Sequence, residues 1–378
     1  MKAPMTHQDS FATLNDASSL KERLVNIHTV VQGYFPFIAR IAVTLYDAQT
    51  NVLRAYEHSG GDEDPLAHYQ ASLDAAPSLK RLLEQGLPRV INRQLTFEEG
   101  EHEHTRRIAR QGYAASYTLP MYNQGVFFGF IFFNASEPDV FSERVLQQLD
   151  VFGHLISLMV IGEISNARVL SAVVNTVAHI THQRDPETGS HLDRMSRYSH
   201  LIARGLASKY QLDDDYIEHI LMFSPLHDIG KVGIPDSVLL KPGTLSAEER
   251  AVMSTHVLKG REMIDRMVLN FGLHSLQHVD VLRNIAEYHH EAIDGSGYPS
   301  GRKGQDIPLE ARIVAVADVF DALTSRRPYK DAWSVDQAFA YLIQVAGEKL
   351  DRECVQVLVD NREAVEEIQR RFAEDPLG

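Results

Sequence analysis

Histidine is unevenly distributed along this chain, and its distribution constrains the fold more than any other feature of the sequence. Eleven of the eighteen histidines lie between His179 and His290, and none follows His290. Several stand with acidic residues in apolar, helix-forming segments. Because imidazole and carboxylate groups are costly to bury unless they are paired, we expect them to face one shared site at the centre of a helical bundle.

The candidate site is centred on His227 and Asp228, which follow an apolar helical run, with Lys231 about one turn later. A neutral imidazole beside a carboxylate suits a divalent metal, and the lysine could meet a phosphoryl oxygen. An isolated pair of this kind is more often the solvated end of a helix. Recurrence in five helical segments favours a metal site, with the candidate ligands Glu187, His191, His227, Asp228, His256, His289, His290 and Asp318.

Each candidate ligand also has an ordinary structural interpretation. Glu187 and His191 are spaced as a helix-surface pair, and His256 is expected on a helix that begins at Ser246. All eight residues would need such a role at once. Eight nitrogen and oxygen donors are too many for one metal, so they predict two or three divalent metal ions, iron or manganese in preference to zinc.

Composition excludes several other classes of protein. The single cysteine, Cys354, excludes a disulfide framework within the chain and a thiolate metal cluster. The formal net charge of -14 argues against long nucleic acids, whose binding requires many phosphates to be neutralised. The apolar run at residues 126–133 is far shorter than the ~20 residues that span a bilayer. We therefore expect a cytoplasmic protein with no signal segment and no membrane insertion.

The first half of the chain predicts an α+β domain at residues 19–160, preceded by a mobile polar tail at residues 1–18. Alternating apolar residues predict two hairpins, with strands at 40–46 and 52–57 and at 116–122 and 126–134. Helical patterns lie between the hairpins at 72–85 and 96–111.

A long apolar helical stripe follows from Ser142 and predicts a connector helix at residues 161–183. Such a stripe is typical of core packing or of a dimer seam. We expect a homodimer formed through this helix, which would let the first domain act on the second.

The order of these elements resembles a GAF domain. The resemblance rests on the first hairpin, on the segment Leu119-Pro-Met-Tyr-Asn-Gln-Gly-Val-Phe-Phe-Gly129 and on the helix after Phe141. It implies a sensor domain for a small ligand. The Asn-Lys…Phe…Asp-Glu signature of cyclic-nucleotide-binding GAF domains is missing, so the GAF ligand stays unassigned. We interpret His102 and His104, which lie in a charged segment, as hydrated residues rather than haem ligands.

Five motifs in the second half occur in the order of a known family. They are Glu187-Thr-Gly-Ser-His191, His227-Asp-Ile-Gly-Lys231, the segment from His289 to Pro299, the segment from Ile307 to Ile313, and the segment from Ala317 to Lys330. The chain resembles the HD-GYP domain, the cyclic-di-GMP phosphodiesterase branch of the HD hydrolases. The resemblance implies an all-α HD-type helical bundle at residues 184–378 and a sensor enzyme with GAF and HD-GYP parts.

The resemblance also implies roles for individual residues. All eight candidate ligands would bind metal, with Asp228 bridging two ions and Glu187 indicating a trinuclear centre. The residues that match positions for substrate phosphates are Lys231, Arg327 and Lys330. The segment Gly297-Tyr298-Pro299 would form a structured loop with partner contacts, and diguanylate cyclase (GGDEF) domains are the suggested partners.

The chain departs from the family pattern at two places. Ala292 stands where the family usually has Arg, and Leu350-Asp-Arg352 replaces the usual Phe-Asp-Pro. Neither change removes a candidate ligand, although the loss of the Arg could alter the packing of the loop or the binding of a partner.

The resemblance implies hydrolysis of cyclic-di-GMP to linear pGpG. We expect a metal-activated water to attack the phosphodiester in line with the leaving oxygen. Whether a second cut to GMP follows is left open. Two alternatives also stay open. One is an HD-type hydrolase of another cyclic dinucleotide or of a nucleotide, and the other is an inactive cyclic-di-GMP-binding scaffold.

Overall fold

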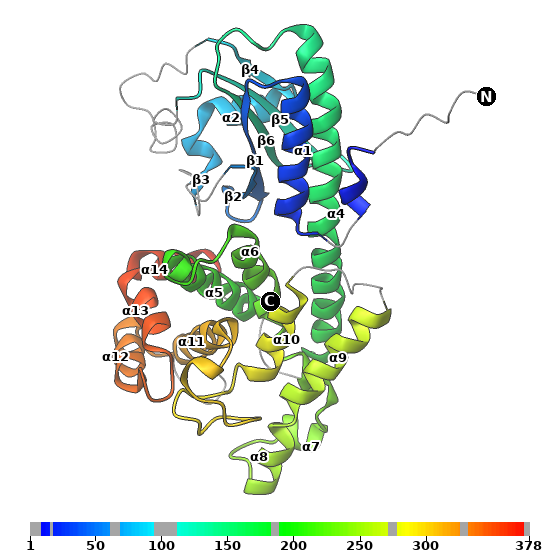
Figure 1. Cartoon of the computed structure of the whole chain (residues 1–378). Helices are drawn as coiled ribbons and strands as arrows, with labels where there is room; N and C mark the ends of the chain where they lie inside the picture. Colours follow the sequence, from blue (N-terminus) through cyan, green and yellow to red (C-terminus); the bar gives the residue numbers. More distant parts are fainter. Residues whose placement is uncertain are drawn as a thin grey trace, which may run out of the picture. The chain divides into compact units, whose positions relative to one another are not determined.

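The computed structural model describes residues 9–15, 18–60, 69–93, 112–182, 189–270, 278–325 and 332–373, with the backbone alone at 166–182. The chain divides into two compact units, residues 1–165 and 166–378. Helix α4 (Glu143–His182) begins in the first unit and ends in the second (Figure 1). The first unit combines a sheet with helices and the second is helical, which confirms the predicted fold class.

Six antiparallel strands form the sheet of the first unit, in the order β3-β2-β1-β6-β5-β4. Both predicted hairpins are confirmed and supply the central strands β1 (Ile38–Asp47), β2 (Val52–His58), β5 (Ala115–Asn123) and β6 (Val126–Ala135). Two further strands were not predicted, β3 (Gln70–Ser72) and β4 (Arg89–Ile91). Three residues are too few to show the alternation that identifies a strand.

Helices cover both faces of this sheet. A Cβ added to Gly153 of α4 would lie 2.4 Å from Leu119 Cδ2, so α4 packs closely on strand β5. Phe130 packs with Leu79 and Leu82 of α2 (Pro77–Gln85). Because successive side chains of a strand alternate between faces, Phe130 and Phe133 lie on opposite sides of the sheet. Phe133 is also near Gly153, which places α2 and α4 on opposite faces.

The remaining helices of this unit follow local sequence signals. Helix α1 (Leu20–Tyr34) begins with a capping box between Ser19 and Glu22. The helix predicted at 72–85 is interrupted, because a 3₁₀ turn, Leu73–Ala75, precedes α2. Pro77 has no N–H and therefore fits the first turn of a helix but not its interior. The helix predicted at 96–111 lies outside the described residues. Near the start of the chain is a second 3₁₀ turn, Ala12–Asn15.

The first part of α4, Glu143–Ser165, has the length and mean hydropathy (1.5) of a membrane-crossing helix, with 28% of its apolar stretch buried. Helices of soluble proteins often meet the same criteria, so this property alone is weak support for a membrane span. The prediction of no membrane insertion rests on the shorter apolar run at 126–133. The absence of membrane insertion therefore stays a prediction.

The second unit is a helical bundle around α5 (Gly189–Tyr210), which packs against α6, α11, α13 and α14. Its α-helices are α6 (Asp214–Phe223), α7 (Asp236–Leu239), α8 (Ala247–Met253), α9 (His256–Asn270), α10 (Val279–Tyr288), α11 (Leu309–Thr324), α12 (Val335–Val345), α13 (Arg352–Asp360) and α14 (Arg362–Arg371). In the described part of this unit, the 3₁₀ helices that join them are η3 (Ser224–Leu226), η4 (Ile229–Gly233) and η6 (Gly304–Asp306).

The helix expected to run from Ser246 through His256 is two helices, so that expectation is wrong. Ser246 begins α8, which ends at Met253, and His256 begins α9. The Ser254 hydroxyl donates to the Arg250 carbonyl at 2.8 Å and the Thr255 hydroxyl donates to the Val252 carbonyl at 2.7 Å. Serine and threonine hydroxyls that bond to backbone carbonyls in this way compete with helix continuation.

Candidate metal centre

His227 and Asp228 lie in the turn between η3 and η4, directly after α6. The His227 side chain is buried, its Nδ1 is 3.0 Å from the Ser224 carbonyl oxygen, and its Nε2 is 3.2 Å from Asp228 Oδ2. Gly230 allows the next turn to contact α9, because a Cβ there would lie 1.8 Å from the carbonyl oxygen of His256. This close approach brings His256 beside Asp228.

Asp228, His256, His289 and His290 form one group of potential ligands, with one donor atom of each within 4.8 Å of the others. Asp228 Oδ1 lies 3.1 Å from His256 Nε2 and 3.6 Å from His289 Nε2. The Nδ1 atoms of His256 and His289 are 2.8 and 2.9 Å from backbone carbonyl oxygens of Met253 and Ile285. These bonds fix the rings with Nε2 turned toward the carboxylate, as is common for metal-binding histidine.

His191, His227 and Asp318 form a second group of the same kind. The two groups are adjacent, because His227 Nε2 is 3.2 Å from Asp228 Oδ2 and 3.9 Å from Asp318 Oδ1. Helix α5 supplies His191 and helix α11 supplies Asp318. Seven of the eight predicted ligands are therefore brought together by five parts of the bundle, which are α5, the turn between η3 and η4, the start of α9, the end of α10 and α11. The eighth, Glu187, lies outside the described residues.

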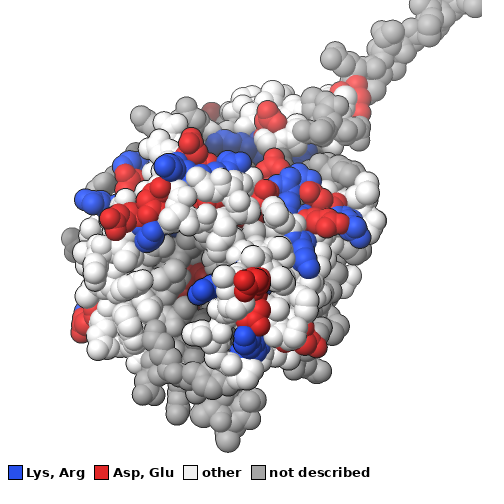
Figure 2. All heavy atoms as spheres, turned by 90° about the horizontal axis from the view of Figure 1, so that it is seen from below, with Lys and Arg blue, Asp and Glu red and all other residues white. Residues whose placement is uncertain are grey.

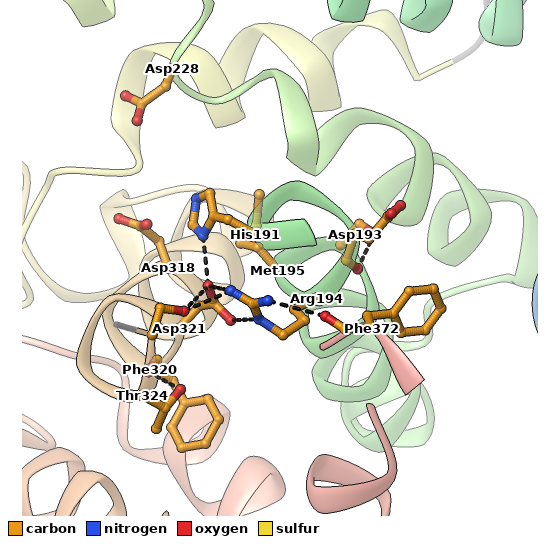
Figure 3. A network of polar contacts seen from close by, with 12 residues as sticks. His191, Asp193, Arg194, Met195, Asp228, Asp318, Phe320, Asp321, Thr324 and Phe372 are labelled. Carbon is orange, nitrogen blue, oxygen red and sulfur yellow. Dashed lines mark hydrogen bonds and ion pairs between the residues drawn. The ribbon is translucent and has the colours of Figure 1, made fainter. Parts of the chain in front are cut away.

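An ion-pair network behind His191 was missed by the sequence analysis. His191 Nδ1 donates to Asp321 Oδ2 at 2.7 Å, and Arg194 donates to both oxygens of the same carboxylate at 2.7 and 3.0 Å. Figure 3 shows both side chains meeting at Asp321, with Asp318 on the same helix. The three-residue spacing of Asp318 and Asp321 on α11 was the available signal, because it places both carboxylates on one helix face.

Lys231 is the described residue among the three predicted phosphate contacts. Its Nζ lies 2.8 Å from Asp228 Oδ2, and its side chain is 20% exposed. The other two, Arg327 and Lys330, lie outside the described residues. A cation at the rim of a group of carboxylates and imidazoles is well placed to meet an anionic ligand.

The segment with Gly297 and Tyr298 folds back onto the candidate centre. A Cβ at Gly297 would lie 2.5 Å from the His290 carbonyl oxygen, so this position requires glycine. The Tyr298 ring packs on the His290 imidazole with 4.8 Å between centroids. Glu291 accepts hydrogen bonds from the backbone N–H groups of Ser300 and Arg302 at 2.7 and 3.0 Å, which order the segment.

The protonation states of Asp228, His289 and His290 suit the binding of a metal cation. Burial alone would raise the pKa of Asp228, but Lys231 and His227 hold it well below its usual range. Burial, with a contribution from His289, lowers the pKa of His290 well below its usual value, and burial likewise lowers the pKa of His289. At neutral pH these groups are an ionised carboxylate and neutral imidazoles, the forms that bind metals.

The fit to metal ions rests on potential metal-ligand atoms that are buried and make no hydrogen bond. Among the described residues, Asp228 Oδ1, His256 Nε2 and His289 Nε2 are in this state. Burying such atoms costs free energy unless a partner compensates. Two adjacent groups of nitrogen and oxygen donors around Asp228 could hold more than one ion.

Residues 177–354 match the family model of the HD domain. The second unit contains an HD domain. The HD part of the resemblance noted from the motifs is thereby confirmed. In this HD domain, the pair His227 and Asp228 lies at the junction of the two groups of potential ligands.

Three curated relatives share this region. The chain is 45% identical over 200 residues to the cyclic di-GMP phosphodiesterase response regulator RpfG of Xanthomonas campestris pv. campestris, covering 53% of this chain and 50% of the relative. It is 41% identical to a probable cyclic di-GMP phosphodiesterase of Vibrio cholerae, covering 55% and 48%. It is 40% identical to the 3'3'-cGAMP-specific phosphodiesterase 2 of Vibrio cholerae, covering 50% and 34%. The chain thus spans about half or less of these relatives.

Solved structures give a weaker likeness. The GAF domain of an Acinetobacter phosphoenolpyruvate-protein phosphotransferase is 15% identical, with 42% of this chain and 92% of that chain covered and a TM-score of 0.32. The α+β architecture of the first unit rests on its own sheet and helices.

One face of the molecule is hollowed near its middle in the space-filling view (Figure 2). Acidic and basic side chains lie in and beside the hollow, and a larger mixed group lies along one margin. Among the described residues on this face, basic side chains alternate with acidic ones and form no continuous stripe.

Proposed function

We propose that this chain is a metal-dependent phosphodiesterase that hydrolyses cyclic-di-GMP to pGpG. The observation that carries the proposal is the pair of adjacent donor groups around Asp228, with Lys231 2.8 Å from the same carboxylate. The relatives named as cyclic di-GMP phosphodiesterases support the choice of substrate. Two or three divalent ions, iron or manganese, would make a water nucleophilic near neutral pH and offset negative charge on phosphoryl oxygens.

The protein's own residues would position the substrate and the ions. Asp228 would bridge two ions, since its oxygens face His227 on one side and His256 on the other. Lys231 would contact the phosphoryl group under attack. Arg327 and Lys330 would hold the second phosphate, and Glu187 would complete a third metal position.

The first unit would act as a GAF-type sensor that regulates the HD domain. Val151 and Leu158 on α4 are 69% and 71% exposed and seven residues apart, so these two apolar side chains lie on one helix face. A homodimer through α4 would cover this face and connect the two sensor units. We further propose a cytoplasmic location and GGDEF domains as output partners.

The test joins metal content to turnover. The full chain, purified without oxygen, should contain two or three iron or manganese ions and convert cyclic-di-GMP to pGpG, with chromatography also showing whether GMP follows. Asp228→Ala should lose both metal and activity, because it removes the carboxylate shared by the two groups. Turnover by Asp228→Ala at the wild-type rate would overturn the bridging role.

A second candidate substrate is 3'3'-cGAMP, because one relative at 40% identity is named as specific for it. The same assay should therefore include both cyclic dinucleotides at equal concentration. Cleavage of 3'3'-cGAMP alone by metal-filled protein would replace the proposed substrate. If metal-filled protein binds cyclic-di-GMP but cleaves neither cyclic dinucleotide, that result would instead support a receptor role.

A further inference from the structure

A third group of imidazole and carboxylate side chains lies outside the candidate centre. It consists of Asp215, His219 and His278, with one donor atom of each within 4.8 Å of the others. His278 Nε2 is 3.0 Å from Asp215 Oδ2, and His219 Nδ1 is 3.4 Å from Asp215 Oδ1. None of the three belongs to the motifs that define the candidate centre.

The bundle holds these three side chains in place. Asp215 and His219 are four residues apart on α6, so they lie on one helix face. His278 directly precedes α10 and has a left-handed backbone, with φ of 56°. Its ring lies 4.9 Å from the ring of His219 and 5.6 Å from that of Tyr216, centroid to centroid. The group therefore joins two helices that are distant in sequence.

One imidazole nitrogen of the group is buried without a hydrogen bond. The His219 side chain is fully buried, and its Nδ1 lies 2.8 Å from the Asp215 carbonyl oxygen. Its Nε2 has no hydrogen-bond partner among the described residues. Such a nitrogen costs free energy unless a partner compensates. A metal ion would have to bind this Nε2, because Nδ1, the ring nitrogen 3.4 Å from Asp215 Oδ1, donates to the backbone and has no free lone pair.

We propose that Asp215, His219 and His278 bind a zinc ion. Two imidazoles and one carboxylate are typical protein ligands of zinc, and a fourth, tetrahedral position would be taken by water. The His278 side chain is 26% exposed, so the site has a side open to solvent. The chain would then have two separate metal requirements, iron or manganese at the candidate centre and zinc at this group.

This zinc ion would stabilise the elements that carry the catalytic groups. Helix α6 leads through η3 to His227 and Asp228, and α10 ends directly before His289 and His290. A ligand pair on α6 and a third ligand at the start of α10 would cross-link these helices. Ten residues of α10 span about 15 Å, so the zinc would lie too far from the centre to contact the substrate there.

The first test counts zinc in the full chain. Metal-free protein is loaded with zinc, desalted and analysed by inductively coupled plasma mass spectrometry. His278→Ala should hold about one zinc per chain less than the wild type, and it is the suitable variant because His278 is partly exposed. His154→Ala, at an exposed histidine of α4, is the matched control and should hold as much as the wild type. Equal zinc in His278→Ala and the wild type overturns the proposal.

The second test needs no change at the site itself. Diethyl pyrocarbonate modifies accessible imidazoles, and peptide mass spectrometry reports the extent at His278. In the Asp228→Ala background, which disables the candidate centre, added zinc should slow modification of His278 at least tenfold while His154 stays equally reactive. Modification of His278 at the same rate with and without zinc would show a hydrogen-bonded clamp between α6 and α10 that binds no metal.

Discussion

Asp321 is a buried carboxylate that positions the candidate metal ligand His191 without being a candidate ligand itself. It accepts hydrogen bonds from His191 and from Arg194, and all three side chains are nearly inaccessible to solvent. Burial alone would raise the pKa of Asp321, but His191 and Arg194 lower it below its usual range. The ionised carboxylate therefore fixes the tautomer and orientation of the His191 ring.

Asp321→Asn should weaken both metal binding and folding. The change removes the negative charge behind His191, for which we expect metal affinity to fall about 10- to 100-fold. It also leaves the buried Arg194 charge without its carboxylate counter-ion, which should cost about 3–5 kcal/mol of unfolding free energy. Metal titration and denaturant unfolding measure the two effects. Asp336→Asn, which breaks the exposed ion pair with Arg362, is the control and should change neither quantity.

Lys231 should affect turnover more than metal content. Lys231→Ala removes the cation beside Asp228 Oδ2, and we expect kcat/KM to fall roughly 100-fold or more because charge on the phosphoryl group is no longer offset. Metal content should stay at the wild-type level. Lys231→Arg keeps the charge and should recover part of the activity. Full activity in Lys231→Ala would remove this residue from the substrate site.

At the level of elements, the contact between η4 and α9 determines where His256 lies. Gly230→Ala would place a Cβ 1.8 Å from the His256 carbonyl oxygen, so one element must move. We expect a loss of about 1–3 kcal/mol in unfolding free energy, and lower metal content. Gly162→Ala is the matched control in α4, where no atom lies within 4 Å of the added Cβ. It should be neutral or stabilising by up to about 1 kcal/mol.

The packing of α13 can be followed through its cysteine. Cys354 is fully buried in the core of the second unit, and burial raises the pKa of its thiol. Since the thiolate is the reactive form, alkylation by iodoacetamide at pH 8 should be slower in the native protein than in the denatured chain by at least tenfold. Mass spectrometry of both samples gives the rates. Equal rates would show that α13 opens readily.

At the scale of the whole molecule, the helix face of α4 that exposes Val151 and Leu158 should govern association. Leu158→Glu places a charge on the face proposed as the dimer seam, and we expect the dissociation constant of the dimer to rise tenfold or more. Light scattering over a range of concentrations measures it. Leu240→Glu, at an exposed leucine outside α4, is the control and should leave association unchanged. A wild-type chain that is monomeric at all concentrations would exclude the dimer.

The sequence alone determined the fold class, the two hairpins and the residues of the candidate centre. Alternating residues near β1 and β6 are visible locally because a strand has a period of two, and buried histidines are conspicuous because apolar helices seldom contain them. Motif order then indicated the HD domain, which the family match confirmed. The metal-binding and substrate roles of all the candidate residues stay predictions, and Glu187, Arg327 and Lys330 also lie outside the described residues.

Only the tertiary structure showed which side chains meet. The pairing of Asp321 with His191 joins residues 130 positions apart, and the group of Asp215, His219 and His278 joins α6 to the start of α10. Contacts of this kind depend on how helices cross, and helix crossing is determined by the shapes of whole packed surfaces. The short strands β3 and β4 also form through their neighbours, because three residues gain their hydrogen bonds from the adjacent strand.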